Sequence, residues 1–233
     1  MYTIAIISQK GGAGKTTLAV HLATASSHLK KNTAIIDLDP QASAANWSDR
    51  RQADIPVVIS AHASRLKHEI ARVKEAECEI LLLDTAPHSD STALEAIKVA
   101  DLVLIPCRPA ILDMEAIANS INLVRSNKTP FFVVMNATAP QGHEAMEAAE
   151  AIQETINALD ATLGDRVCPV HIVNRVAFSR SPITGETAQE YEPNGKAAQE
   201  IERVHTFMYE QLNKITGEQR GKITDVEQVC ESA

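Results

Sequence analysis

The chain has 233 residues, of which 45% are hydrophobic and 22% charged, and this composition is typical of a soluble globular protein of one domain. Lys and Arg number 22 against 30 Asp and Glu, so the net charge is −8 and a surface that is basic throughout is excluded. The cysteines lie far apart without a CxxC pair, which argues against a zinc site or disulfide framework and is compatible with a reducing cytosol. No apolar run approaches the roughly 18 residues of a membrane span, and we expect no secretory signal.

Apolar runs alternate with segments of helical spacing along the chain. The runs predict strands at 2–8, 33–37, 57–59, 79–84, 101–106, 130–136 and 166–173. The helical spacing predicts helices at 15–30, 41–51, 62–75, 90–99, 113–126, 143–159 and 195–213. Because the strands are continuously apolar, we expect an α/β fold: a doubly wound, mostly parallel sheet with helices on both faces. It should form one domain, 1–213, followed by a polar, flexible tail at 214–233.

Three of the nine glycines lie within four positions, between the first predicted strand and the first predicted helix. The segment 9–17 (QKGGAGKTT) matches the end of the phosphate-loop pattern GxxxxGK[ST], with Gln9 at the first glycine position. Small residues let successive backbone N–H groups point at phosphate oxygens, and the helix adds the positive end of its dipole. We expect Lys15 to reach the terminal phosphates and Thr16 to ligate Mg²⁺. The predicted nucleotide-binding residues of the loop are Gly11, Gly12, Ala13, Gly14, Lys15, Thr16 and Thr17.

Aspartates end two of the predicted buried strands. Asp37 and Asp39 follow the strand at 33–37, and Asp84 ends the strand at 79–84. Carboxylates at the carboxyl ends of parallel strands emerge at the ligand-binding edge of the sheet. Because Mg²⁺ keeps several waters and takes only one or two carboxylates, we expect Asp84, and with it Asp37, to hold the metal through water. Each aspartate taken alone could also be a helix cap.

The loop, with its extra lysine at position 10, resembles the deviant phosphate loop KGGxGK[ST] of the ParA-type partition and MinD-type ATPases. The segments DLDPQAS (37–43), DTAP (84–87), VLIPCRP (103–109) and 175–201 are similar to ParA-type sequences as well. The resemblance covers roughly residues 2–213 and implies a single-domain P-loop NTPase fold with ATP and Mg²⁺ as cofactors.

Several roles follow from this resemblance alone. Lys10 would cross a two-fold interface and contact the phosphates bound by the other subunit. Asp39 would position the attacking water, and residues 84–90 would form a switch segment that senses the terminal phosphate. Asn136 matches the position from which the family contacts adenine, although it could also be a turn residue. The segment 127–130 (NKTP) lacks the Asp of the guanine-binding NKxD motif, so ATP is favoured over GTP.

The resemblance also implies a cycle and its partners. ATP would close two copies into a homodimer, the dimer would bind DNA non-specifically, and a ParB-like centromere-binding protein would stimulate hydrolysis, in the cytoplasm and on the nucleoid. Residues 165–181 have a local charge of 3 − 1 = +2 and residues 194–222 of 5 − 4 = +1, so DNA phosphates should bind in the C-terminal third. The candidate DNA-binding residues are Arg175, Arg180 and Arg203.

Rival interpretations remain open. An ATPase that positions a protein complex over the nucleoid would share nearly every feature, whereas a metabolic P-loop ligase or kinase would leave Lys10 without a task. An iron–sulfur reductase is disfavoured because Cys78 and Cys107 lack the glycines expected around cluster ligands. Membrane binding through the tail 214–233 is not expected either, because the tail has no Phe, Leu or Trp.

Overall fold

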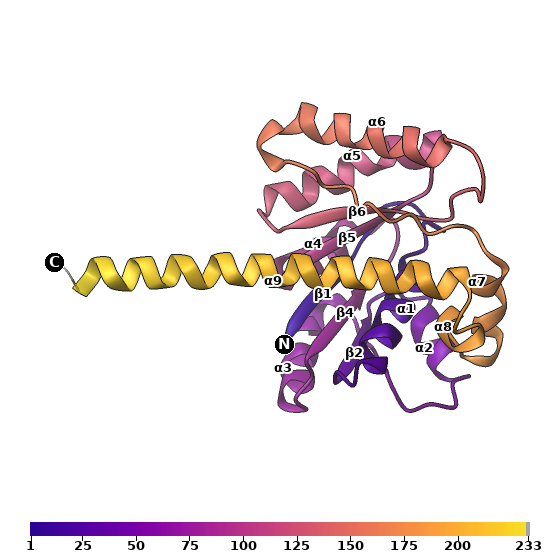
Figure 1. Ribbon diagram of the computed structural model, residues 1–233. Coiled ribbons are helices and arrows are strands. Elements are labelled where there is room, and N and C mark those ends of the chain that lie inside the picture. The colour runs from indigo at the N-terminus through magenta and orange to yellow at the C-terminus, as the bar shows by residue number, and fades with distance from the viewer. Residues whose placement is uncertain (232–233) are drawn as a thin grey trace.

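A single six-stranded sheet forms the centre of the protein (Figure 1). The computed structural model describes residues 1–231, except the side chains of 111–112, 114–115 and 218–231. All five strand pairings are parallel, in the order β3-β2-β4-β1-β5-β6, which confirms the predicted sheet. The strands are β1 (Tyr2–Ile6), β2 (Thr33–Asp37), β3 (Val57–Ser60), β4 (Ile80–Asp84), β5 (Leu102–Cys107) and β6 (Phe131–Met135).

The register of the sheet places the predicted site residues at one edge. Asp84 of β4 lies opposite Asp37 of β2 on one side and opposite Ile6 of β1 on the other. The chain leaves β1 at this edge and enters the phosphate loop, between neighbours β4 and β5 that come later in the sequence. A crevice at such a point in a parallel sheet is where α/β proteins bind their ligands.

Helices cover both faces of the sheet. Alternate residues of β1 and the residue after it show why: Ile4 and Ile6 pack with α1 (Lys15–His28) and α9 (Lys196–Glu231), whereas Ala5 and Ile7 pack with the four helices from α3 (Leu66–Glu75) to α6 (Glu144–Leu159). Both faces are therefore dry, which accounts for the continuously apolar strands. The α-helices are α1 (Lys15–His28), α2 (Ser43–Ser48), α3 (Leu66–Glu75), α4 (Asp90–Val99), α5 (Ile111–Ser126), α6 (Glu144–Leu159), α7 (Val176–Arg180), α8 (Ala188–Tyr191) and α9 (Lys196–Glu231). Short 3₁₀ helices are η1 (Ala63–Arg65), η2 (Ala161–Leu163) and η3 (Ser181–Thr184).

The expected strand at 166–173 is wrong. This segment runs beside β6 but forms only two isolated bridges, Val133 with Val167 and Thr138 with Val173. Pro169 lies between the two bridges and has no N–H group to donate to a ladder, so continuous pairing is interrupted. The short helices α7 and α8 were not predicted.

The last helix is longer than the sequence pattern indicates. Helix α9 runs to Glu231 instead of ending near residue 213, and Figure 1 shows it continuing beyond the body of the protein. Its expected core stripe is confirmed, because Ala197, Ile201, Val204, Met208 and Leu212 are all buried. The flexibility of 214–233 stays a prediction. Within the described residues, no helix is both long and apolar enough to span a membrane.

Candidate nucleotide-binding site

The phosphate loop is fastened to the end of β6. Asn136, the residue after β6, donates a hydrogen bond from Nδ2 to the carbonyl oxygen of Ala13 at 2.7 Å. The same nitrogen lies 2.0 Å from the point where a Cβ on Gly14 would be, and Gly14 has a φ of +96°. Only glycine combines this left-handed backbone with so close an approach. At position 14, both the backbone conformation and the packing therefore require a glycine.

The loop forms one wall of an open cavity of about 480 Å³, a volume within the range of small-molecule sites. Phosphate-loop residues, the beginning of α1, the segment after β2 and the η3 segment line it. Most of the predicted nucleotide and catalytic residues meet here. The lining residues are Gly11, Gly12, Gly14, Lys15, Thr16, Thr17, Val20, His21, Asp39, Gln41, Ser43, Trp47, Arg50, Pro87 and Pro182.

Lys15 is a buried cation at the first position of α1. Its ammonium donates one long hydrogen bond, of 3.4 Å, to the carbonyl oxygen of Lys10. Burial lowers the pKa of Lys15, while the negative charges of Asp84 and Asp39 act in the opposite direction. An anion in the cavity would supply the hydrogen-bond acceptors that this ammonium group lacks.

Asp84 is the complementary buried anion. Both of its carboxylate oxygens are buried, and neither accepts a hydrogen bond of ordinary geometry from the described residues. Burial raises the pKa of Asp84 to about 7, although the neighbouring Thr16 hydroxyl pulls the pKa downward. Unpaired buried oxygens beside a hydroxyl are the donor set that hydrated Mg²⁺ prefers, so these residues fit the metal that the sequence predicts.

Asp37 and Asp39 have different surroundings. The Asp37 carboxylate accepts backbone hydrogen bonds from Asp39, Ala44 and Ala45, at 2.9–3.1 Å. Asp39 lines the cavity, where its Oδ1 accepts the backbone N–H of Gln41. Asp37 therefore binds backbone N–H groups at the beginning of α2 without being its N-cap residue, and its role at the metal stays a prediction.

Lys10 lies at the start of the loop but does not line the main cavity. It is half-buried, and among the described residues no ion pair to its side chain is found. Arg108, which sequence reasoning did not select, lies nearby: its Nη1 is 3.8 Å from the position of a Cβ on Gly12. The buried carboxylate of Asp113 binds this guanidinium at 2.5 and 3.2 Å. Arg108 lies in the segment VLIPCRP (103–109), which is similar to ParA-type sequences, but no role was predicted for it because its proximity to Gly12 and its pairing with Asp113 only emerge in the fold.

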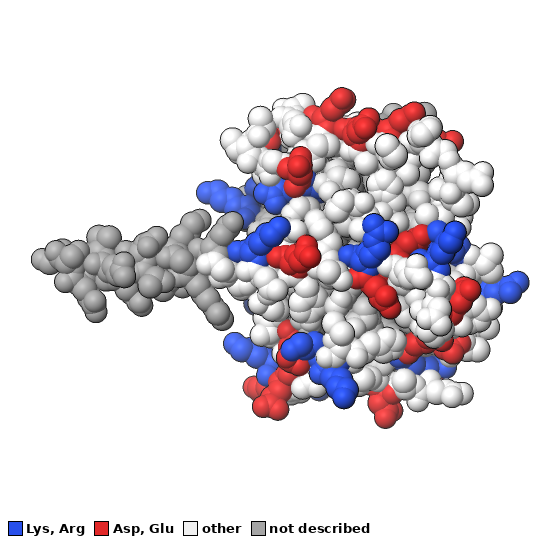
Figure 2. All heavy atoms as spheres, in the orientation of Figure 1, with Lys and Arg blue, Asp and Glu red and all other residues white. Residues whose placement is uncertain are grey.

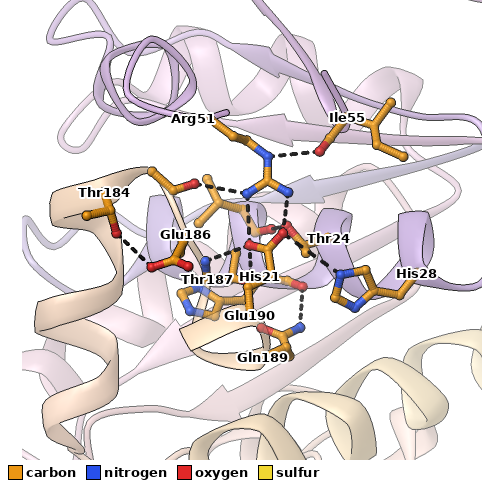
Figure 3. A network of polar contacts seen from close by, with 12 residues as sticks. His21, Thr24, His28, Arg51, Ile55, Thr184, Glu186, Thr187, Gln189 and Glu190 are labelled. Carbon is orange, nitrogen blue, oxygen red and sulfur yellow. Dashed lines mark hydrogen bonds and ion pairs between the residues drawn. The ribbon is translucent and has the colours of Figure 1, made fainter. Parts of the chain in front are cut away.

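A buried polar network joins the nucleotide helix α1 to α8 (Figure 3). His21 Nδ1 lies 2.7 Å from the carbonyl oxygen of Thr17, and His21 Nε2 accepts the backbone N–H of Ala188 at 3.0 Å. This arrangement needs the neutral ring with its proton on Nδ1, and burial lowers the pKa of His21 to about 4. The Gln189 side chain adds a hydrogen bond to the carbonyl oxygen of His21. The α8 segment is thereby held against the back of the nucleotide site.

The same network contains a bidentate ion pair between Arg51 and Glu190, with hydrogen bonds of 2.8 and 2.5 Å (Figure 3). Although burial acts against it, hydrogen bonds from Arg51 and Thr187 hold the pKa of Glu190 below its ordinary value. Arg51 also donates to the carbonyl oxygen of Gly185, where a Cβ would lie 2.4 Å from the Arg51 backbone nitrogen. The segment after α2 and the segment 181–191 are therefore packed backbone to backbone.

The three candidate DNA-binding arginines have unlike environments. Arg175 donates to Glu200 at 2.5 and 3.0 Å, so its charge is used within the protein. Arg180 and Arg203 are exposed. The three arginines therefore do not share one kind of environment, and their contact with DNA stays a prediction.

Comparison with known families identifies the fold. Residues 4–188 match the family described as CobQ/CobB/MinD/ParA nucleotide binding domain. A similar protein is "Maintenance of carboxysome distribution protein A" of Gloeobacter kilaueensis, 30% identical over 91% of this chain and 94% of the relative. "Protein ParA" of Rhizobium radiobacter is 27% identical over 93% of this chain and 98% of that protein.

Solved structures of low sequence identity share the fold. The MinC:MinD cell division protein complex of Aquifex aeolicus matches with a TM-score of 0.71 and 18% identity, over 90% of this chain and 96% of that one. An ATP complex of a Cyanothece McdA variant matches with a TM-score of 0.68 and 17% identity, over 93% and 96%. At these identities the likeness concerns the fold alone.

The contact between Gly14 and Asn136 can be tested by substitution. We expect Gly14→Ala to lower the free energy of unfolding by about 1–2 kcal/mol for the left-handed backbone and by about 1–3 kcal/mol more for the overlap with Asn136. The control is the same substitution in an Asn136→Ala background, because removing the Asn136 side chain removes the overlap and leaves only the left-handed backbone at position 14. Urea unfolding without nucleotide measures the loss in both backgrounds, and equal losses would contradict the proposed contact.

The ion pair between Arg51 and Glu190 can be tested by comparing its loss with the loss of an exposed ion pair. Glu190→Gln leaves the largely buried Arg51 guanidinium without a counter-charge, so we expect a loss of about 2 kcal/mol in the free energy of unfolding. The control is Glu95→Gln, which breaks the exposed pair with Lys98 and should leave the free energy of unfolding nearly unchanged. Urea denaturation measures both variants. Similar small losses in the free energy of unfolding would mean that the buried ion pair stabilises the protein no more than the exposed one.

Proposed function

Because the chain belongs to the CobQ/CobB/MinD/ParA nucleotide-binding family, as an ATPase of the ParA/MinD type, we propose that it is an ATP-driven partition protein. ATP with Mg²⁺ binds in the cavity beside the phosphate loop and closes two copies into a homodimer. The dimer retains DNA without regard to sequence, in the cytoplasm and on the nucleoid. A ParB-like protein on the segregated DNA stimulates hydrolysis and releases the dimer.

The observation that supports this proposal is a pair of buried, poorly paired charges at the carboxyl edge of the sheet. Among the described residues, Lys15 has one distant acceptor and the Asp84 oxygens have no hydrogen-bond donor of ordinary geometry, so a triphosphate and a hydrated cation would complement both residues at once. Thr16 and Asp84 would hold Mg²⁺, which when bound neutralises charge on the phosphate oxygens. Asp39, at the cavity wall, would orient the attacking water in line with the terminal phosphate.

The base is proposed to be adenine. Asn136 uses its Nδ2 to hold Ala13, and within the described residues its Oδ1 accepts no hydrogen bond that meets ordinary criteria. A carbonyl oxygen can accept from the amino group of adenine but finds only another acceptor at the corresponding oxygen of guanine. This supports ATP over GTP. Asn136 would then have two roles, because it supports the phosphate loop and also contacts the base.

A second candidate function differs only in cargo. Relatives from Gloeobacter kilaueensis and Halothiobacillus neapolitanus are named "Maintenance of carboxysome distribution protein A", at 30% and 25% identity. The same ATP-dependent switch could therefore space a large protein complex over the nucleoid. Affinity capture with the Asp39→Ala variant, held in its ATP state, decides between them: a centromere-binding protein indicates DNA partition, and an adaptor of a protein assembly indicates positioning.

The switch itself is tested by DNA retention in different nucleotide states. We expect the protein to bind duplex DNA with a slowly hydrolysed ATP analogue, and to bind at least about tenfold more weakly with ADP or without nucleotide. Lys15→Ala should abolish the ATP-dependent binding, while Lys98→Ala, at an exposed position of α4, should not change it. Fluorescence anisotropy of a labelled duplex measures the affinity. Equal binding in all nucleotide states would overturn the proposed switch.

The action of Lys10 on the partner's phosphates predicts complementation. Lys10→Ala and Asp39→Ala should each lose ATPase activity as homodimers. In a mixed dimer, however, the Lys10→Ala subunit keeps its Asp39 and receives Lys10 from the Asp39→Ala subunit, so one intact site forms. When equal amounts of the two variants exchange freely, about half of the dimers are mixed and each has one intact site of two, so we expect about a quarter of the wild-type activity. Phosphate release measures the rate; the absence of any gain on mixing would indicate that Lys10 acts within its own subunit.

A further inference from the structure

A second cavity, of about 400 Å³, lies at the end of the sheet opposite to the nucleotide site. Phe131, the first residue of β6, lies at its floor, whereas Asn136 follows the other end of the same strand and contacts the phosphate loop. The remaining walls come from the end of α5, from the η2 segment and from α9. We call this cavity the basic groove.

The charges that line the basic groove do not follow the charge of the chain. Four of its side chains are cationic and one is anionic, a balance of 4 − 1 = +3, on a protein with a net charge of −8. The cations are Arg125, Lys128, Arg166 and Lys214, and the anion is Asp160. Asp160 Oδ1 accepts hydrogen bonds from both the backbone and the hydroxyl of Thr162, which ties the carboxylate to its own turn.

The arginines of the groove are held in place by the fold. The Arg166 guanidinium lies 5.4 Å from the ring centre of Phe132 and 5.9 Å from that of Phe131, in cation–π geometry. Arg125 donates to the carbonyl oxygen of Leu159. Lys128 and Lys214 are exposed and reach the groove from opposite walls. Two fixed and two adaptable cations thus converge on one cavity.

Helix α9 carries one more cation on this side, with the exposed Glu210 between it and the groove. Arg203 precedes Lys214 by eleven residues, close to three helical turns, so both lie on the same side of the helix. Burial raises the pKa of Cys168, in the segment that contains Arg166, and the nearby charge of Arg203 acts in the opposite direction. On the face drawn in Figure 2, Lys and Arg gather beside the place where α9 leaves the body, whereas Asp and Glu gather along the upper edge formed by α6.

We propose that the basic groove binds the phosphate backbone of duplex DNA, with Lys128 and Lys214 as its principal contacts. Lysines on two walls of an open groove attract consecutive phosphates without reading bases, which is what sequence-independent retention requires. This inference rests on the proposed function and moves the DNA surface from Arg175, which is paired with Glu200, to the end of the sheet away from the nucleotide. Nucleotide and DNA then use separate sets of charges.

The experiment compares two variants of equal charge change. Lys128→Gln/Lys214→Gln removes the exposed cations of the groove, and Lys67→Gln/Lys74→Gln removes two exposed lysines of α3, which lies against β2 and away from β6. Binding of a labelled duplex is measured with a slowly hydrolysed ATP analogue at several salt concentrations. We expect the groove variant to bind about tenfold or more weakly and its log–log salt slope to fall by about 1.8 per occupied groove. ATP binding should be unchanged in both variants.

Each other outcome has a definite meaning. Wild-type protein that fails to bind the duplex in any nucleotide state overturns the proposed function itself. Wild-type binding that the groove variant keeps, or that the α3 variant loses equally, overturns the groove assignment and leaves the proposed function standing. Binding of inorganic tripolyphosphate in the groove, with DNA affinity unaffected by the groove variant, assigns the cavity to a small polyanion and also overturns the proposal.

Discussion

The burial of opposite charges at one edge of the sheet constrains everything else in this protein. Lys15 and Asp84 are both removed from water, yet the fold provides almost none of the hydrogen bonds that would compensate them. Burial accordingly lowers the pKa of the lysine and raises that of the carboxyl group to about 7. The edge is therefore costly for the protein alone and becomes favourable when an anion and a cation arrive together.

The surroundings of the edge keep this costly arrangement in position. Asn136 supports the phosphate loop from one side, and Asp37 fixes the beginning of α2 on the other. Behind them, His21 is held as a neutral ring between α1 and α8. These hydrogen bonds lie within the chain, whereas the two buried charges have almost none. The molecule thus combines a frame of hydrogen-bonded polar groups with a small centre whose charges a ligand can complement.

Much of the fold and of the centre could be predicted from the sequence. Continuous apolar runs indicated the parallel strands because every strand is covered on both faces. The glycine cluster indicated the phosphate loop, and the parallel register then brought Asp37 beside Asp84 as expected. These features depend on local pattern and on the geometry of a parallel sheet, and both can be read without coordinates.

The remaining features depend on contacts between distant segments. Helix α8 has four residues and is anchored by a bond between Arg51 and Glu190, 139 positions apart, so its local pattern contained no periodic signal. Pro169 broke a strand that its apolar neighbours indicated. The pairing of Arg175 with Glu200 and the convergence of cations in the basic groove also arise only in three dimensions.

The close packing at Gly185 has a consequence for motion. A Cβ there would lie 2.4–2.5 Å from backbone atoms of Arg50 and Arg51, so no side chain fits between the two segments. The chain that follows Asp39 cannot shift without displacing the chain that leads into α9. A movement of the segment after Asp39 would therefore pass through the contact at Gly185 to the segment that leads into α9, the helix whose Lys214 lines the basic groove.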